Sequence, residues 1–375
     1  MLMDVVTILA AVGVGFASIQ EGSKRPRDLV VGDRAPKLDV ARWVKGDPVV
    51  AYAKGRIYVV DFWATWCRQC RESMPHLSEI QSKYAGRLDV IGIDVWEPDP
   101  ADVEPFVKKV GDAMRYRVAV DVVPAPTEGT ENRRTWASEH GATSILWLKS
   151  SGWLEQGIPV AFVVDGEGRI AWIGEPKELD EPLAQIVAGT WDLEKERAAY
   201  LAGLEILQRA KPIRVRLNEA EDRGDWKTFL ACIDELLMLD GKRFADLAGG
   251  KFQTLLLELK QPDRAYAFAR EAIDGVAKDN ASALGQIAYV ILYMTGDPIP
   301  ASALEIAGKA ARRANEGAQS KRPGILDSLA RVRFLENDLA GAIEAETKAI
   351  EVARSDEQRA EFGKRLGDYE RARAR

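Results

Sequence analysis

The sequence is poor in cysteine and histidine, and it carries no excess of positive charge. Its three cysteines are too few for a small secreted fold stapled by disulfides. A zinc site would need Cys or His ligands beyond the pair Cys67 and Cys70, and the candidates Cys232, His76 and His140 form no second paired motif, so no metal is expected. The net charge of -6 argues against a nucleic-acid partner, which would require a basic face.

Apolar runs long enough to span a membrane are missing as well. The stretch 5–17 is apolar and has the length of a signal-peptide core, but it is short for a bilayer span. Gly15 and Ala17 offer small residues for cleavage, although the usual basic residues before such a core are absent. We expect 1–17 to be a signal peptide or anchor and 18–29 a linker, so that the protein is exported, periplasmic or envelope-associated. It would be cytoplasmic if this run is not a signal.

What the sequence does contain is a Cys-x-x-Cys pair behind an apolar run. The segment 59–66 indicates a buried strand and a tight aromatic turn, and Cys67 and Cys70 stand at the start of a helix. Two thiols at this spacing can close a disulfide across one helical turn. Cys67 would lie where unsatisfied N–H groups and the helix dipole favour negative charge, which makes it a nucleophilic thiolate. We therefore expect disulfide exchange through this pair.

The surrounding pattern predicts an α/β domain over 30–190, with a mixed sheet and helices on both faces. An insertion flanking the active site is expected at about 124–157, with a short helix near 132–140. Strands are predicted over 57–62, 88–95, 117–123, 160–165 and 169–174, and helices over 68–84, 101–113 and 178–189.

Three motifs within 30–190 resemble one known family. Gly32-Asp33-x-Ala35-Pro36, Phe62-Trp63-Ala64-Thr65-Trp66-Cys67 and Val163-Val164-Asp165-Gly166-x-Gly168 resemble the opening motif, the active-site run and the hairpin of thioredoxin-like reductases of the TlpA/ResA type. The resemblance implies a thioredoxin fold and an enzyme that exchanges thiols and disulfides with protein substrates. It also implies an upstream redox partner, and no cofactor is expected.

The same resemblance assigns roles to the thiols and to a nearby acid. Cys67 would be the attacking thiolate and Cys70 the resolving thiol, in agreement with the stronger dipole at the helix tip. Asp61 matches the acid that accepts the proton of the resolving cysteine in thioredoxin; alternatively, it caps backbone groups at the strand end. Thioredoxin also has a lysine near this acid on the next strand, where this sequence has 90–92 as Val-Ile-Gly, so the coupling of the acid to a lysine stays open.

Further site residues follow from the family pattern. Pro159 matches a cis-proline opposite the thiols, which would expose the backbone of Ile158 to a substrate peptide. The alternative is a trans proline that opens a strand. Trp66 would shield the disulfide and offer a flat apolar contact, whereas Trp63 is expected in the core. Arg68 would stabilise the thiolate and favour an oxidant, but the family pattern favours a reductant, so the direction stays open.

The region 191–375 differs in composition and predicts an all-α domain. Trp is almost absent, and Ala, Leu, Glu and Arg dominate. Similar helix starts recur at spacings of 37, 38 and 39 residues, namely at 228–230, 265–267, 303–305 and 342–344. Repeats of this size predict stacked helix pairs similar to tetratricopeptide (TPR) repeats. Such a stack can hold a protein partner in a groove, or it can serve as a dimerisation or docking lobe.

Two other functions remain open at this point. A thiol peroxidase of the peroxiredoxin type belongs to the same superfamily, but it would have Thr three residues before Cys67, where this chain has Ala64. In a scaffold protein the helical repeats would be the function and the redox domain vestigial, which the intact cysteine pair argues against. Cys232 lies in an apolar helical run and is expected to be a buried structural thiol.

Overall fold

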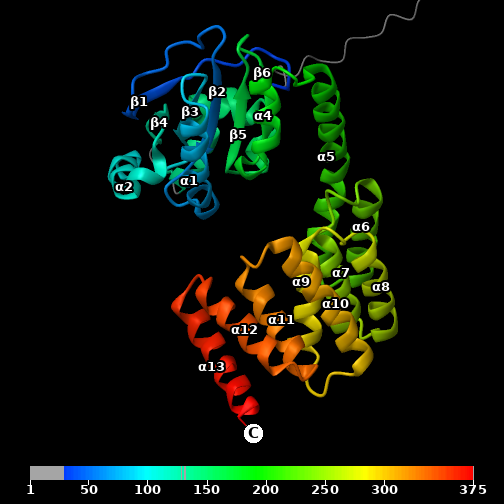
Figure 1. Cartoon of the computed structure of the whole chain (residues 1–375). Coiled ribbons are helices and arrows are strands. Elements are labelled where there is room, and N and C mark those ends of the chain that lie inside the picture. The colour runs from blue at the N-terminus through cyan, green and yellow to red at the C-terminus, as the bar shows by residue number, and fades with distance from the viewer. Residues whose placement is uncertain (1–28, 128, 131, 375) are drawn as a thin grey trace, which may run out of the picture. The chain divides into compact units, whose positions relative to one another are not determined.

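The structure is a computed structural model that describes residues 29–127, 129–130 and 132–374. The expected signal or anchor segment, and the linker up to residue 28, lie outside the described residues. The chain separates into two compact units, 1–202 and 203–375 (Figure 1). Within the described part of the chain, no helix is both long and apolar enough to cross a bilayer.

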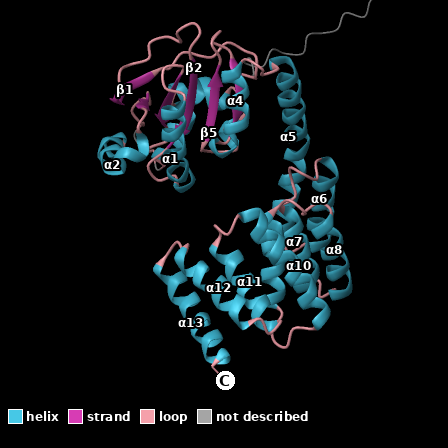
Figure 2. Cartoon of the chain, viewed as in Figure 1, coloured by secondary structure: helices cyan, strands magenta, loops and turns pink. Residues whose placement is uncertain are grey.

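The first unit is built on one mixed sheet of six strands in the order β1-β4-β3-β2-β5-β6. Figure 2 shows its strands in magenta and the helices in cyan. Strands β2, β3 and β4 run parallel, whereas β1, β5 and β6 are antiparallel to their neighbours. β2 is central and buried along its whole length, as an apolar, β-branched run should be. The strands are β1 (Val40–Lys45), β2 (Ile57–Trp63), β3 (Leu88–Asp94), β4 (Arg117–Asp121), β5 (Val160–Val164) and β6 (Ile170–Gly174).

Helices cover both faces of this sheet, which confirms the predicted fold class. One face packs under α1 (Arg68–Lys83), α2 (Val103–Val110) and α4 (Asp180–Ala188). The other face is covered by the π-helical turn η3 (Ser144–Lys149) and by the first residues of the long helix α5 (Leu193–Asp222). The remaining short helices of this unit are η1 (Pro100–Asp102), η2 (Gly111–Met114), α3 (Arg133–His140), η4 (Trp153–Glu155) and η5 (Pro176–Glu178).

The observed elements differ from the prediction in two places. β1 was not predicted, because this edge strand carries Arg42 and Lys45 and shows no run of buried residues. The helix expected over 101–113 is divided into η1, α2 and η2. The short helix near 132–140 is present as α3, where the Asn132 side chain accepts a hydrogen bond from the Thr135 amide.

In the second unit, all described secondary structure is helical. The four recurring segments lie at the starts of α6, α8, α10 and α12, as the spacing predicts. Cys232 is free and fully buried in the core of this unit, so its expected structural place is confirmed. After α5, the helices are α6 (Trp226–Leu239), α7 (Leu247–Gln253), η6 (Thr254–Glu258), α8 (Pro262–Asp274), α9 (Ala281–Tyr289), η7 (Val290–Met294), α10 (Ala301–Ala318), α11 (Pro323–Leu335), α12 (Leu339–Glu351) and α13 (Asp356–Arg373).

Candidate active site

Cys67 and Cys70 form a disulfide at the N-terminus of α1. The S–S distance is 1.99 Å, and Cys67 is the residue that caps the helix. Its Sγ accepts a hydrogen bond from the backbone N–H of Cys70 at 3.1 Å. Cys67 retains 5% exposure, whereas Cys70 has none. A donor aimed at the first sulfur, together with the helix dipole, favours negative charge there, so this geometry suits a thiolate at Cys67.

The loop before β5 lies against this pair. The Ile158-Pro159 peptide bond is cis, which confirms the prediction for Pro159. The carbonyl oxygen of Ile158 lies 3.8 Å from the Cys67 Sγ. Beside Pro159 is a hollow of about 420 Å³ whose lining mixes polar and apolar surface; it is bordered by Gln69, Glu72, Ser73, His76, Pro159, Glu175, Pro176 and Lys177. The sulfur that faces solvent therefore lies beside an exposed polypeptide edge and an open hollow.

Trp66, the neighbour of Cys67, is covered on one ring face. The Arg134 guanidinium lies 3.9 Å from the centroid of the ring, and the indole N–H donates to the carbonyl of Trp96 at 3.3 Å. The ring is half-buried. Arg134 comes from α3, within the segment expected to flank the active site. Sequence reasoning did not identify this arginine, because nothing local links it to a residue so far away in the chain.

A buried acid fixes the turn before the disulfide. The carboxylate of Glu97 accepts hydrogen bonds from the backbone N–H and the hydroxyl of Thr65. Asp94 is buried beside Glu97, and no described group donates to its carboxyl oxygens. Burial, and then the charge of Glu97, raises the pKa of Asp94 well above its usual value. Glu97 and Asp94 were not singled out in the sequence, although two acids at the end of an apolar strand are a usable signal.

Asp61 lies in the core beneath α1. It is fully buried, and neither carboxyl oxygen has a hydrogen-bond partner among the described residues. Burial raises the pKa of Asp61 to about 8. The alternative that Asp61 caps backbone groups at the strand end is not supported, because neither carboxyl oxygen accepts a hydrogen bond from a described backbone group. A buried acid without a partner is costly to ionise, and it can hold or release a proton near neutral pH.

The charged groups around α1 are turned away from the sulfurs. The Arg68 guanidinium pairs with Glu72 at 3.2 Å, and both side chains are 55% exposed. Exposed pairs of this kind are screened by water, so Arg68 adds little charge at Cys67. His76 lies 3.0 Å from the Asp180 carboxylate, on the outer side of α1 as expected.

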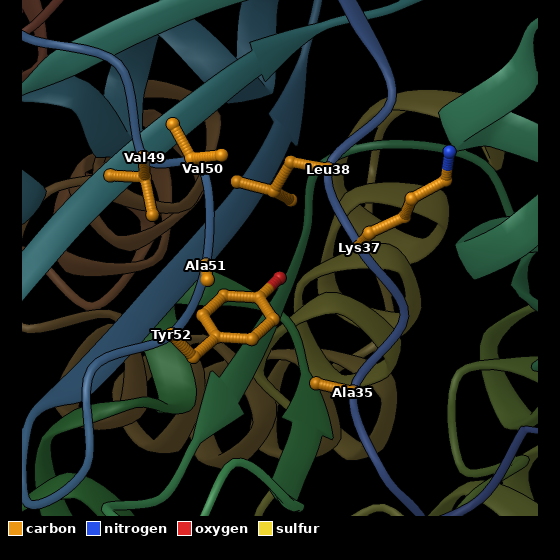
Figure 3. Close-up of a pocket in the computed structure, with 7 residues that line it drawn as sticks. All are labelled: Ala35, Lys37, Leu38, Val49, Val50, Ala51 and Tyr52. Atoms are coloured by element: carbon orange, nitrogen blue, oxygen red, sulfur yellow. The ribbon is translucent and has the colours of Figure 1, made fainter.

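A second hollow of the first unit lies before the start of β2, whereas Cys67 follows the end of that strand. It measures about 180 Å³ and is lined by Ala35, Lys37, Leu38, Val49, Val50, Ala51 and Tyr52 (Figure 3). The Tyr52 hydroxyl donates to the Pro36 carbonyl at 3.0 Å. The lining is mainly apolar and brings no pair of titratable groups together, so the chemistry of this unit is placed at the disulfide.

Known proteins are similar in sequence to the part of this chain that contains the disulfide. The sequence model of the AhpC/TSA family matches residues 31–173. Protein FixW of Rhizobium leguminosarum is 29% identical over 216 residues, which are 56% of this chain and 92% of FixW. The thiol-disulfide oxidoreductase ResA of Bacillus thuringiensis subsp. konkukian is 30% identical over 139 residues, 34% of this chain and 79% of ResA.

Among solved structures, a thiol-disulfide isomerase from Corynebacterium glutamicum has 23% identity and a TM-score of 0.33, covering 42% of this chain and 96% of its own. The match to ResA extends over most of that enzyme. The chain therefore belongs to the family of the ResA enzymes, and it is a thiol-disulfide oxidoreductase.

Proposed function

We propose that this enzyme exchanges disulfides with protein substrates through Cys67 as the nucleophile and Cys70 as the resolving thiol. The Cys67 thiolate attacks a substrate disulfide; a bond forms between Cys67 and one substrate sulfur, and the other substrate sulfur leaves as a thiolate. Cys70 then attacks the Cys67 sulfur, which closes the Cys67–Cys70 disulfide and releases the second substrate thiolate. The substrate gains two electrons and the cysteine pair loses them; an upstream redox partner restores them. Run backwards, the same steps oxidise a substrate dithiol.

Asp61 serves in this scheme as the general base for Cys70. The resolving thiol must lose a proton before it can attack, and Cys70 is buried away from water. Val59 and Trp63 belong to the same core cluster as Cys70, and strand alternation places Asp61 between them on that face. A carboxylate in this place can take the thiol proton and return it when the pair is reduced again.

Ile158, Pro159 and Trp66 form the substrate-binding edge in this proposal. The carbonyl of Ile158 lies beside the reactive sulfur and precedes the first residue of β5, so it lies outside the strand ladder. A substrate segment in extended conformation could pair with this backbone while its sulfur reaches Cys67. The free edge of Trp66 would then contact apolar atoms next to the substrate cysteine.

The single observation that carries the proposal is the position of the two sulfurs at a helix N-terminus, Cys67 with 5% exposure and Cys70 with none. The test is turnover of a protein disulfide by the wild type and by Cys67→Ser, Cys70→Ser and Cys232→Ser variants. We expect Cys67→Ser to be inactive and Cys70→Ser to accumulate a mixed disulfide. Cys232→Ser should act like the wild type. Activity retained by Cys67→Ser would refute the proposal, and rapid consumption of peroxide by Cys67 would instead favour a thiol peroxidase.

We also propose that the helical repeats recruit protein partners to the redox domain. Tyr289 and Met294 in α9 and η7 are 49% and 45% exposed, and the Tyr289 ring contacts Tyr293 at 5.1 Å between centroids. Neighbouring exposed apolar side chains on one helix are a usual contact surface for a protein.

A Tyr289→Ser/Met294→Ser variant tests this role. Its turnover of a protein substrate should fall, while its reaction with a small aromatic disulfide should not change. Met238 in α6 is 87% exposed and provides the control Met238→Ser. Equal turnover of protein substrate by all variants would remove the recruiting role. A change in mass in solution would point to a dimerisation lobe instead.

Export of the protein is proposed from the apolar segment 5–17. Fractionation of cells that express the full chain with a C-terminal tag tests it. We expect the tag outside the cytoplasmic membrane, and loss of this localisation when residues 1–17 are removed. A fully cytoplasmic tag would refute export.

A further inference from the structure

We propose that the Tyr116 hydroxyl and the Trp63 indole N–H are the hydrogen-bond donors that hold the ionised Asp61 carboxylate. They are positioning residues for the resolving step, because they would act on the base and not on the substrate. The inference rests on the proposed role of Asp61 as general base. The sequence left the coupling of Asp61 to a lysine open, since the next strand offers only 90–92, which carry no charge.

The strand register leaves Asp61 between two small residues. Asp61 is paired with Gly92 of β3 on one side and with Ala161 of β5 on the other. Directly paired residues point to the same face of a sheet, so neither neighbour fills the space beside the carboxyl group. The same face contains Trp63 two residues further along β2, and Tyr116 just before β4 packs into the same core cluster.

Gly92 allows these two side chains to come close to the acid. A Cβ atom at Gly92 would lie 3.0 Å from the Trp63 Nε1 and 3.0 Å from the Tyr116 Cε2. Both polar side chains therefore cross the strand position next to Asp61, which a larger residue would block. Burial is the main cause of the raised pKa of Tyr116, and the charge of Asp61 is the second cause, which also indicates that the two groups are close.

The three groups are complementary and otherwise unused. Asp61, Trp63 and Tyr116 are all nearly or fully buried, with 0%, 0% and 4% exposure. None of their polar side-chain atoms has a partner among the described residues. These two donors and the Asp61 carboxyl group are left over in one core, next to the equally unpartnered carboxyl group of Asp94, although almost all buried polar groups in proteins are paired. A small side-chain rotation or one bridging water would satisfy all three when the carboxyl ionises.

Other groups around Asp61 do not supply this pairing. From α1 it is faced by Cys70, from β3 by Gly92 and from β5 by Ala161, none of which carries a fixed charge. The next acid on this face is Asp94, opposite Trp63 in the register, and Glu97 lies beside it. Neither acid offers a positive charge or a fixed donor to Asp61, whose pKa is raised by burial, so we assign the donors to Tyr116 and Trp63.

The experiment compares Tyr116→Phe with Tyr58→Phe in the full chain. Tyr58 is equally buried, but it lies on the opposite face of β2 and its hydroxyl accepts a hydrogen bond from the Ala53 amide. Titration of the Asp61 side-chain carbon by NMR, in the dithiol form, gives the pKa directly. We expect Tyr116→Phe to raise this pKa by about one unit, the size of one hydrogen bond to a charged group. The pH profile of the resolving step should shift in the same direction, with roughly a tenfold loss of rate at pH 7.

The Trp63 indole resonance gives a second readout without any change in the core. Its N–H signal should titrate together with Asp61 in the wild type and lose this titration in Asp61→Asn. In the Asp61→Asn background, Tyr116→Phe should cause no further change in the pH profile. An Asp61 pKa that is the same in Tyr116→Phe and Tyr58→Phe, or an indole signal that does not respond to Asp61, would overturn the inference. If Asp61→Asn alone leaves the resolving rate unchanged, the base role itself fails, which is a different result.

Discussion

Replacing Asp61 by Asn should change how the stability of the redox domain depends on pH. An unfolded Asp loses its proton near pH 4, whereas burial raises the pKa of folded Asp61 to about 8. Between these values the folded state binds one more proton than the unfolded state, so stability falls as the pH rises. Asn keeps the shape of the side chain and cannot ionise. The variant should therefore lack this loss.

The size of the effect follows from the pKa difference. Each unit corresponds to about 1.4 kcal/mol, so the wild type should lose about 3–4 kcal/mol relative to Asp61→Asn between pH 5 and pH 8. A donor to the ionised carboxylate reduces this loss, so Tyr116→Phe, which removes one donor, should lose more stability over this pH range than the wild type. Asp112, an exposed acid of the same unit, provides the control Asp112→Asn.

Urea denaturation followed by tryptophan fluorescence measures this effect. All tryptophans except Trp226 precede residue 203, so the signal reports mainly the first unit. Both proteins are kept in the disulfide form at each pH. Parallel curves of stability against pH for the wild type and Asp61→Asn would refute the argument, because they would mean that Asp61 has the same pKa in the folded and unfolded states.

Three further substitutions probe other groups. Glu97→Ala leaves the Thr65 donors unpaired, and it should destabilise the first unit by about 1–3 kcal/mol and slow disulfide exchange, as denaturation and stopped-flow kinetics can measure. Arg365→Leu removes the charged partner of the buried Asp327 carboxylate, which lies 2.7 Å from the guanidinium. The free energy of unfolding of the second unit, measured by circular dichroism, should fall by about 3 kcal/mol. The fall should be smaller at acidic pH, where Asp327 is protonated. Cys232→Ser places a hydroxyl in a largely apolar core, with the Arg216 guanidinium as a polar neighbour, and should cost about 1–2 kcal/mol without changing the reduction potential; a changed potential would contradict the structural role.

The parts of the fold that were predicted are those with a strong local signal. β2 is an unbroken apolar run, and α1 follows a Cys-x-x-Cys pair, so both could be placed within one residue or two. The helix starts of the second unit were found from their spacing. β1 was not predicted, because an edge strand has half of its backbone in water and tolerates charged side chains.

The residues of the candidate site were also predicted only where the local sequence carries a signal. Cys67, Cys70 and Asp61 lie within one short segment, so spacing and resemblance were enough to select them. Tyr116 and Arg134 approach the site from distant parts of the chain, and only the register of the sheet and the position of α3 bring them there. The role of Gly92 could not be predicted from the sequence either. Gly92 matters because it has no side chain, so that Trp63 and Tyr116 can occupy the space beside it.

The unequal burial of the two sulfurs has a practical consequence. A reagent arriving from solvent meets Cys67, while Cys70 stays behind the helix tip. A bulky maleimide added to the reduced protein should therefore react with Cys67 and not with Cys70. A Cys70→Ser variant should keep a substrate protein attached to Cys67 through the mixed disulfide. Immobilised on a resin, that variant would act as bait whose bound polypeptides can be eluted with dithiothreitol and identified by mass spectrometry.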